Sequence, residues 1–383
     1  MTRRENVNAV LNHKDTGMIP ISIGSNNCDG FTKFSKDAYE SFLGYEFTDY
    51  NITSKVMGSV ATPPKILELS ECDFRTVYLK GPENVHVTEY EDGSYLDEYG
   101  VLMKPSEYYY DPVTRPLGGD ITVKDIETYP WPEMATPGRV AGLREEAIKL
   151  RGNTDYAVCV DIPCEGPFEF SLWMRGWEDF LTDFYEQPEV AEALMNKITE
   201  IDLQVWDLLL TEVGDCVDVV CQGDDLGMQD RSIVSAEIYN KYIKKYHKRI
   251  YDLIKSKTNA KIFHHSCGSV YDLIPGLLEA GVDILNPVQT RARHMEPERL
   301  KTQFGKDLVF WGGLDIQKLL PFGTPVQISE EVKRLMEIMG KGGGYVFSPS
   351  HNIQALVPPQ NIDNMIKSAV KYRKRYNKGV SRS

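Results

Sequence analysis

The feature that most constrains the fold is an alternation in the second half of the chain, where short runs rich in Val and Ile are each followed by a longer amphipathic stretch. This alternation is typical of consecutive βαβ units, which build a parallel sheet with helices outside it. The apolar runs predict strands at 156–163, 217–222, 260–266, 282–286, 307–313 and 344–348. The amphipathic stretches predict helices at 189–212, 235–256, 270–280, 294–303, 325–340 and 359–376.

One of these helices has a well-marked start. The sequence Thr324-Pro325-Val326-Gln327 offers a Thr that can cap the helix, a Pro in its first turn and a Gln that can close a capping box. Pro188 and Pro359 also suit first turns.

The number of strands favours a barrel. Residues 17–23 (Gly-Met-Ile-Pro-Ile-Ser-Ile) supply a seventh candidate strand, so we predict an α/β fold of the TIM type, a (β/α)8 barrel, although the pattern does not locate the eighth strand. Residues 28–135 break the alternation, with a β-hairpin pattern around Asp92-Gly93, and we interpret them as an N-terminal insertion over the barrel mouth. No low-complexity linker separates them, so residues 1–383 are interpreted as one domain.

Composition excludes several classes of protein. The net charge of −13 would repel phosphate backbones, and no stripe of Lys and Arg compensates for it, so nucleic acid is not an expected partner. No run approaches the roughly 20 apolar residues of a membrane span. Seven cysteines, an odd number scattered along a long chain, indicate free thiols in a reducing compartment. We therefore expect a cytoplasmic protein without a membrane anchor.

A pair of metal-binding side chains ends the predicted strand 260–266. His265 and Cys267 are two residues apart, so on an extended chain they point to the same face. Imidazole nitrogen and thiolate sulfur are good zinc ligands, and active sites of such barrels lie at the C-terminal ends of strands. The alternative is a core histidine beside a buried cysteine.

Further polar residues follow other predicted strands. His351 follows strand 344–348 and is the third candidate ligand; Glu165 follows strand 156–163 and is the fourth, with an exposed loop glutamate as the alternative. Asp224 and Asp225 follow strand 217–222, and we expect them to orient the substrate or a histidine that binds the metal. The alternative for these two carboxylates is helix capping.

Together these segments carry a family resemblance. Across nearly the whole chain the sequence resembles the uroporphyrinogen decarboxylase superfamily, and specifically its branch of cobalamin-dependent methyltransferases that demethylate methoxylated compounds. The resemblance implies a TIM-type barrel with zinc held by a His-x-Cys pair and a distant third ligand. It rests on five motifs in this order: 223–227 (Gly-Asp-Asp-Leu-Gly), 265–268 (His-Ser-Cys-Gly), 281–289 (Gly-Val-Asp-Ile-Leu-Asn-Pro-Val-Gln), 313–315 (Gly-Leu-Asp) and 323–325 (Gly-Thr-Pro).

Two departures from the family pattern suggest which reaction to expect. Decarboxylases of this superfamily carry arginines near the N-terminus that bind the many carboxylates of their substrate, but residues 21–30 contain no arginine. Relatives that methylate the thiol of coenzyme M carry a second cysteine where this chain has His351. A zinc ion with a single thiolate keeps more positive charge, which suits activation of a donor oxygen.

We therefore expect a Zn²⁺-dependent O-demethylase that transfers the methyl group of a small methoxylated, aromatic substrate to cobalt(I) of a corrinoid. The corrinoid-binding signature Asp-x-His-x-x-Gly is absent, because no histidine has an aspartate two positions before it. The cobalamin is thus expected on a separate corrinoid protein. In this prediction Asp224 and Asp225 are catalytic, and the residues expected to contact the substrate are Asn26, Phe168, Gln289 and Trp311. For Phe168 and Trp311 the alternative is packing in the core.

Three alternatives stay open from the sequence. They are a corrinoid-to-thiol methyltransferase, a metal-free decarboxylase of the uroporphyrinogen type, and a barrel without catalytic activity. The sequence determines neither the methyl donor nor the oligomeric state.

Overall fold

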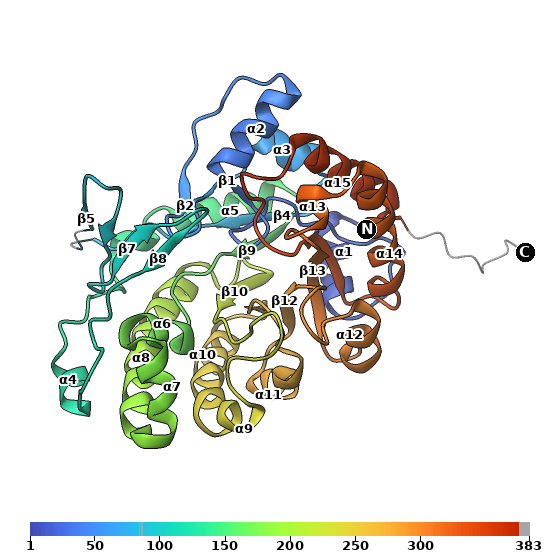
Figure 1. The fold of residues 1–383 in the computed structure, drawn as a ribbon. Coiled ribbons are helices and arrows are strands. Elements are labelled where there is room, and N and C mark those ends of the chain that lie inside the picture. Colours follow the sequence, from blue (N-terminus) through green and yellow to red (C-terminus); the bar gives the residue numbers. More distant parts are fainter. Residues whose placement is uncertain (84, 86, 375–383) are drawn as a thin grey trace, which may run out of the picture.

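The chain folds around a parallel sheet (Figure 1). The computed structural model describes residues 1–83, 85 and 87–374. Seven strands are hydrogen-bonded in the order β14-β13-β12-β11-β10-β9-β4, and every neighbouring pair is parallel. Their bounds are β4 (Phe74–Val77), β9 (Ala157–Val160), β10 (Val219–Gly223), β11 (Lys261–His265), β12 (Ile284–Val288), β13 (Val309–Leu314) and β14 (Tyr345–Pro349).

The predicted first strand, 17–23, lies between the two edges of this sheet. On one side Ile21 pairs in parallel with Phe347 of β14, where Ser22 N donates to Phe347 O at 2.9 Å. On the other side, Asp73 N, immediately before β4, donates to Ile21 O at 2.9 Å. The segment therefore bridges β14 and β4 and closes the barrel, which confirms the predicted α/β TIM-type fold.

The eighth strand that sequence analysis did not locate is β4, inside the stretch 28–135. Only four residues long, it carries a charged side chain in its second position, so it lacks the apolar run on which the other strands were recognised. The Arg75 guanidinium lies 3.6 Å from the ring centroid of Tyr156, which lets a charged residue cover the outer face of the barrel. Part of the predicted insertion thus belongs to the barrel wall.

The helices predicted in the second half are present within a few residues of their expected bounds, except that 235–256 contains a π-helical turn, Tyr239–Ile243. The predicted end of the last helix, at residue 376, lies outside the described residues. These helices surround the sheet (Figure 1). They are α8 (Pro188–Val213), α9 (Ala236–Ile238), α10 (Lys244–Lys257), α11 (Ile274–Ala280), α12 (Pro297–Phe304), α14 (Pro325–Met339) and α15 (Pro359–Tyr372).

The remaining helices mostly lie in the first half of the chain. They are α1 (Arg3–Leu11), α2 (Lys33–Leu43), α3 (Pro64–Leu69), α4 (Val123–Thr128), α5 (Leu143–Asn153), α6 (Pro167–Arg175), α7 (Trp177–Glu186) and α13 (Leu319–Phe322). Among the described residues no helix is both long enough and apolar enough to cross a bilayer.

The start of α14 has the predicted geometry. Thr324 Oγ1 accepts a hydrogen bond from Gln327 N at 3.3 Å, and Gln327 Oε1 accepts one from Thr324 N at 2.9 Å. This reciprocal capping box satisfies backbone donors that would otherwise lack partners at the helix end.

Two small antiparallel sheets lie in the stretch 28–135. One has the order β1 (Phe31–Thr32), β3 (Ser59–Val60), β2 (Ile52–Ser54). The other runs in the order β5 (Thr88–Glu89), β6 (Tyr95–Leu96), β7 (Leu102–Pro105), β8 (Tyr110–Pro112) and extends to one side of the barrel (Figure 1). The turn between β5 and β6 contains Asp92-Gly93, and Gly93 has φ +81°, which a glycine adopts without strain.

The barrel interior is apolar and tightly packed. Trp311 of β13 is fully buried there, with its ring centroid 4.4 Å from that of Phe74 and 5.1 Å from that of Phe263. Its indole nitrogen donates to Asp29 Oδ2 at 3.1 Å, so its polar atom is also satisfied. The prediction that Trp311 contacts the substrate is wrong for this structure, because its side chain points into the barrel interior and leaves no exposed surface.

Candidate metal centre

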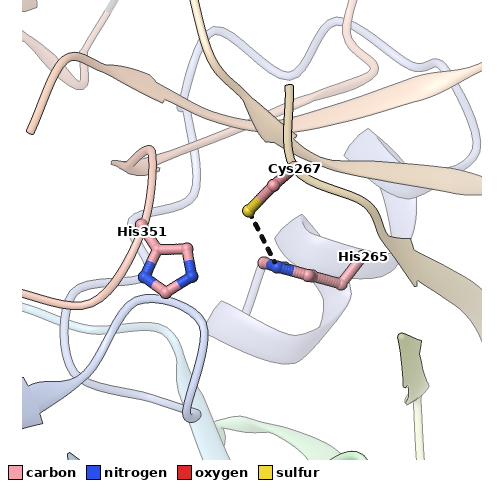
Figure 2. A group of neighbouring side chains, drawn as sticks. All are labelled: His265, Cys267 and His351. Atoms are coloured by element: carbon pink, nitrogen blue, oxygen red, sulfur yellow. Dashed lines mark hydrogen bonds between the residues drawn. The ribbon is translucent and has the colours of Figure 1, made fainter. Parts of the chain in front are cut away.

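Three side chains that can bind a metal meet at the C-terminal ends of the strands. They are His265 at the end of β11, Cys267 two residues further on, and His351 in the loop after β14, and their ligand atoms all lie within 4.8 Å of one another. Figure 2 shows His351 facing the other two, while Cys267 Sγ lies 3.5 Å from His265 Nε2. Since β12 and β13 separate β11 from β14, the curvature of the barrel brings these residues together.

A buried asparagine determines which nitrogen of His265 is free. His265 Nδ1 lies 2.6 Å from Asn286 Oδ1, and Asn286 Nδ2 donates to Trp311 O at 3.1 Å. Because the amide nitrogen is thus assigned as the donor, its oxygen accepts, and His265 Nδ1 carries the proton. The lone pair of His265 Nε2 is then directed toward Cys267.

The same arrangement occurs at His351. Its Nδ1 lies 2.8 Å from Asn352 Oδ1, and Asn352 Nδ2 donates to Ser59 Oγ at 3.1 Å. The hydroxyl of Tyr109 also donates to Asn352 Oδ1, at 2.9 Å. Burial and the nearby His265 lower the pKa of His351 to about 4, so the ring is neutral near pH 7 and its Nε2 can bind a metal.

Cys267 supplies the third donor. Burial raises the pKa of its thiol well above the usual value, and the carboxylates of Asp225 and Glu169 raise it further. The thiolate that metals bind would therefore need a cation beside it. Two imidazoles and one sulfur form a set of donors that suits zinc, so these residues fit a divalent metal ion.

Glu165, the predicted fourth ligand, does not join this group. It lies in the loop after β9 with an exposed side chain. Although the residue is exposed overall, burial of its carboxyl group against the surrounding protein raises the pKa of that group to about 7, and the carboxylates of Glu98 and Asp97 raise it further. Glu165 therefore takes up a proton close to neutral pH.

This raised pKa predicts how stability depends on pH. A folded-state pKa above the usual value means that the folded protein binds more protons than the unfolded chain, so the free energy of unfolding falls as pH rises through about 7. Replacing Glu165 by glutamine removes the titration, so we expect E165Q to gain melting temperature relative to the wild type at pH 8 and to gain little at pH 4. Thermal unfolding followed by circular dichroism at both pH values measures this. An equal difference in melting temperature between E165Q and the wild type at the two pH values would contradict the raised pKa of Glu165.

The two adjacent aspartates after β10 have different surroundings. Asp224 is fully buried, accepts from Phe168 N at 3.0 Å and from Glu169 N at 2.6 Å at the start of α6, and its Oδ2 lies 2.7 Å from His247 Nε2. It caps a helix and contacts a buried histidine. The predicted catalytic role of Asp224 is therefore wrong for this structure, because its carboxylate has no surface open to a substrate.

Asp225 does face the metal-binding group. Its Oδ1 accepts from Cys267 N at 2.7 Å and lies 3.9 Å from His265 Nε2. Its own backbone N donates to Glu169 Oε2 at 3.3 Å. Glu169 was not predicted, because an acidic residue in the first turn of a helix is common without any role in a site.

The remaining predicted substrate residues lie in different places. Gln289 Oε1 accepts from Gly268 N at 2.9 Å, so it holds the loop that carries Cys267. Asn26 is nearly fully buried, and its Oδ1 accepts from Cys28 N at 2.8 Å. Phe168 is fully buried against Phe180, with ring centroids 5.7 Å apart, so the prediction that it contacts the substrate is also wrong for this structure.

The residues that orient the histidines were not predicted from the sequence. Asn286 lies within the motif 281–289, which also contains the predicted residue Gln289, and Asn352 directly follows the predicted ligand His351. Tyr109 belongs to a run of three tyrosines far from either in sequence. Only the tertiary structure shows that these polar atoms reach the histidine nitrogens.

Comparison with known proteins gives a family match and a matching fold. The family described as "Uroporphyrinogen decarboxylase (URO-D)" matches residues 113–372. The uroporphyrinogen decarboxylase of Trichlorobacter lovleyi is 23% identical over 257 residues, which cover 64% of this chain and 69% of that protein. A "Methylcobamide:CoM methyltransferase MtbA" of Methanosarcina acetivorans is 21% identical over 208 residues, which cover 54% of this chain and 57% of that protein.

A solved structure shows the same fold over almost the whole chain. A methyltransferase from Methanosarcina mazei superposes with a TM-score of 0.66 and 16% sequence identity, covering 97% of this chain and 99% of that one. At this level of identity the match describes the fold.

Proposed function

This chain belongs to the uroporphyrinogen decarboxylase family, and we propose that it is a cytoplasmic, zinc-dependent methyltransferase. In this proposal it takes the methyl group from a methoxylated, aromatic substrate and transfers it to cobalt(I) of a separate corrinoid protein. The observation that carries the proposal is the group His265, Cys267 and His351, whose two free imidazole nitrogens and one sulfur lie within 4.8 Å of one another.

The surroundings of this group do not suit the reaction after which the family is named. The acidic side chains of Asp225, Glu169 and Glu165 lie around it. Burial raises the pKa of the Glu169 carboxyl and of the Cys267 thiol, and Asp225 raises both further. A substrate with many carboxylates would bring further negative charge to a place where burial and the neighbouring acidic groups already disfavour the ionised form of Glu165 and Glu169, and residues 21–30 contain no arginine to bind such a substrate. A neutral methoxylated ring avoids this repulsion.

The protein's own residues would prepare the site. Zinc bound there would supply Lewis acidity toward the ether oxygen. Asn286 and Asn352 hold each histidine with its Nε2 lone pair turned toward the metal position. Asp225 anchors the backbone of Cys267, and Glu165, which holds its proton up to about pH 7, could pass that proton to a leaving oxygen.

The orienting role of Asn286 gives a testable prediction. Loss of an outer hydrogen-bond partner of a metal ligand typically costs roughly 10- to 100-fold in metal affinity, so we expect N286A to bind Zn²⁺ weaker by about that factor. Competition with a chromophoric chelator measures the affinity. N361A is the matched control, since Asn361 is also buried but donates to Leu320 O, away from the site. Equal affinities in N286A and the wild type would contradict this role.

The proposed reaction is tested by mixing the zinc-loaded protein with a reduced corrinoid protein and a series of methoxybenzenes. We expect methylcobalamin absorbance to appear with at least one of them and not with the corresponding phenols. No methylcobalamin with any methoxylated donor, in a preparation with one zinc per chain, would overturn the demethylase proposal.

A second candidate is methyl transfer from a corrinoid to a thiol, favoured by the match to the methylcobamide:CoM methyltransferase of Methanosarcina acetivorans. Loss of methylcobalamin absorbance on addition of a thiol, in the absence of any methoxylated compound, would identify this reaction instead.

A further inference from the structure

A cavity of about 390 Å³ lies beside the metal centre but outside it. Its walls come from the start of α2, from β2 and β3, from the tyrosine run before β8, and from the loop after β14. Sites for small molecules typically measure roughly 300–1,000 Å³, so the volume suits one compact ligand.

The walls are largely apolar and aromatic. Phe34 and Ile52 are 69% and 62% exposed, although both are large hydrophobic side chains, and they face the rings of Tyr50, Tyr108 and Tyr110 around the same cavity. Leaving such surface in contact with water is unfavourable, and contiguous apolar surface of this kind marks binding sites. The cavity therefore suits a ring or another flat apolar body.

The charged groups of the cavity select the sign of the ligand. Lys55 is paired with Glu89, and the carboxylate of Glu107 accepts from the hydroxyl of Tyr108 at 2.8 Å. Lys33 has its ammonium 5.1 Å from the ring centroid of Tyr50 and, within the described part of the chain, forms no ion pair with a carboxylate. The lining thus carries two lysines against one carboxylate, and the Lys33 ammonium has no carboxylate within ion-pair distance among the described residues, which favours an anionic group on the ligand.

A chain of hydrogen bonds joins this cavity to the metal centre. Gln354 lines the cavity and donates through Nε2 to the hydroxyl of Tyr109. That hydroxyl donates to Asn352 Oδ1 at 2.9 Å. The same oxygen accepts from His351 Nδ1 at 2.8 Å. Tyr109 thus faces the metal centre, while its neighbours Tyr108 and Tyr110 face the cavity.

We propose that this cavity is a second binding site, for an aromatic ligand with one anionic group, and that its occupancy alters the position of His351 through Gln354, Tyr109 and Asn352. Binding to the cavity does not depend on the function proposed above. The effect on His351 rests on that function, because it assumes a metal ion bound there.

The binding site is tested with a pair of fluorescent probes that share one ring system. They are 1-anilinonaphthalene-8-sulfonate, which is an anion, and N-phenyl-1-naphthylamine, which is neutral. We expect K33M to weaken binding of the anion by about tenfold and to leave the neutral probe nearly unchanged. We expect I52E to weaken binding of both probes, since it places a carboxylate on the apolar wall.

Matched controls are K341M, the same change at another exposed lysine, and V326E, which places a glutamate on another exposed β-branched residue; Val326 is 65% exposed. Both controls should bind the probes as the wild type does. Wild-type affinity for the anion in K33M, or for both probes in I52E, would overturn the proposed site. All four positions are exposed, so circular dichroism should show folded protein in each case.

The connection to His351 is tested in protein loaded with cobalt(II), whose visible absorption reports the ligands around the metal. We expect 1-naphthoate, an anion without visible absorption, to shift this spectrum in the wild type. Y109F should bind 1-naphthoate with unchanged affinity but show no shift, because it lacks the hydroxyl that joins Gln354 to Asn352. Binding without any shift in the wild type would overturn the connection alone. Failure to bind cobalt(II) would overturn the connection together with the proposed function, and the fluorescence result would still decide the cavity.

Discussion

Replacing Cys267 by alanine is expected to remove bound zinc and to reduce the rate of methyl transfer by more than about 100-fold. Loss of a residue that only hydrogen-bonds to a metal ligand costs up to about 100-fold, and loss of a ligand itself should cost more. Cys267 is the only thiol in the group with His265 and His351, and it would contribute the only negative charge among the three ligands. H265A should have the same result. Elemental analysis of the purified protein and the rate of methylcobalamin formation measure both effects.

C216A is the matched control for this prediction. Cys216 is a buried cysteine in the turn between α8 and β10, whose Sγ lies 3.5 Å from Asp215 Oδ1, away from the metal centre. This variant should retain zinc and turnover. Circular dichroism should show that C267A is folded, because Cys267 lies in a loop at the barrel mouth. One zinc per chain and full turnover in folded C267A would refute the metal assignment.

Replacing Asp224 by alanine is expected to lower the free energy of unfolding by about 3–5 kcal/mol, the range typical when one partner of a buried polar pair is removed. Three donors would lose their acceptor, namely the backbone nitrogens of Phe168 and Glu169 and the Nε2 atom of His247. These three donors lie around a fully buried carboxylate, so water cannot easily take the place of that carboxylate as their acceptor. Urea unfolding followed by circular dichroism measures the loss.

Asp225 provides an internal control one residue away. Its side chain is 31% exposed and its carboxylate accepts from Cys267 N, so D225A should cost less than about 2 kcal/mol in stability while lowering metal affinity. Equal losses of stability in D224A and D225A would show that the two aspartates do not divide the structural and the site-forming roles in this way.

Helices and strands were predictable from the sequence wherever the spacing of apolar residues matches the face that the element buries. The helix 325–340 was predicted from its apolar period and its capping residues, and α14 begins at Pro325 with the capping box in place. Strand β4 was not predictable in this way, because four residues with a central arginine do not form an apolar run. Its assignment depends on pairing with β9 and on the contact of Arg75 with Tyr156, which are both long-range.

The site was predictable to a smaller extent. His265 and Cys267 could be paired from their spacing alone, because both lie on one face at the end of one strand. The roles of Asp224 and Asp225 could not be separated, since adjacent carboxylates after a strand look alike in a sequence. Trp311 was misassigned for a similar reason, because period 2 does not tell which face of a strand turns into a closed barrel.

The sequence by itself determined the alternation of strands and helices, hence the α/β barrel, and the chemical types of side chain at the strand ends. These are local properties, set by periodicity and by residue identity over a few positions. Only the tertiary structure decided that His351 meets His265 and Cys267, although β11 lies three strands away from β14. It also decided that Asn286 and Asn352 turn the Nε2 atoms of the two histidines toward one point, and that Asp224 caps a helix. Those outcomes depend on how the barrel closes and on hydrogen bonds between residues far apart in the chain, and such contacts form only when the whole sheet is assembled.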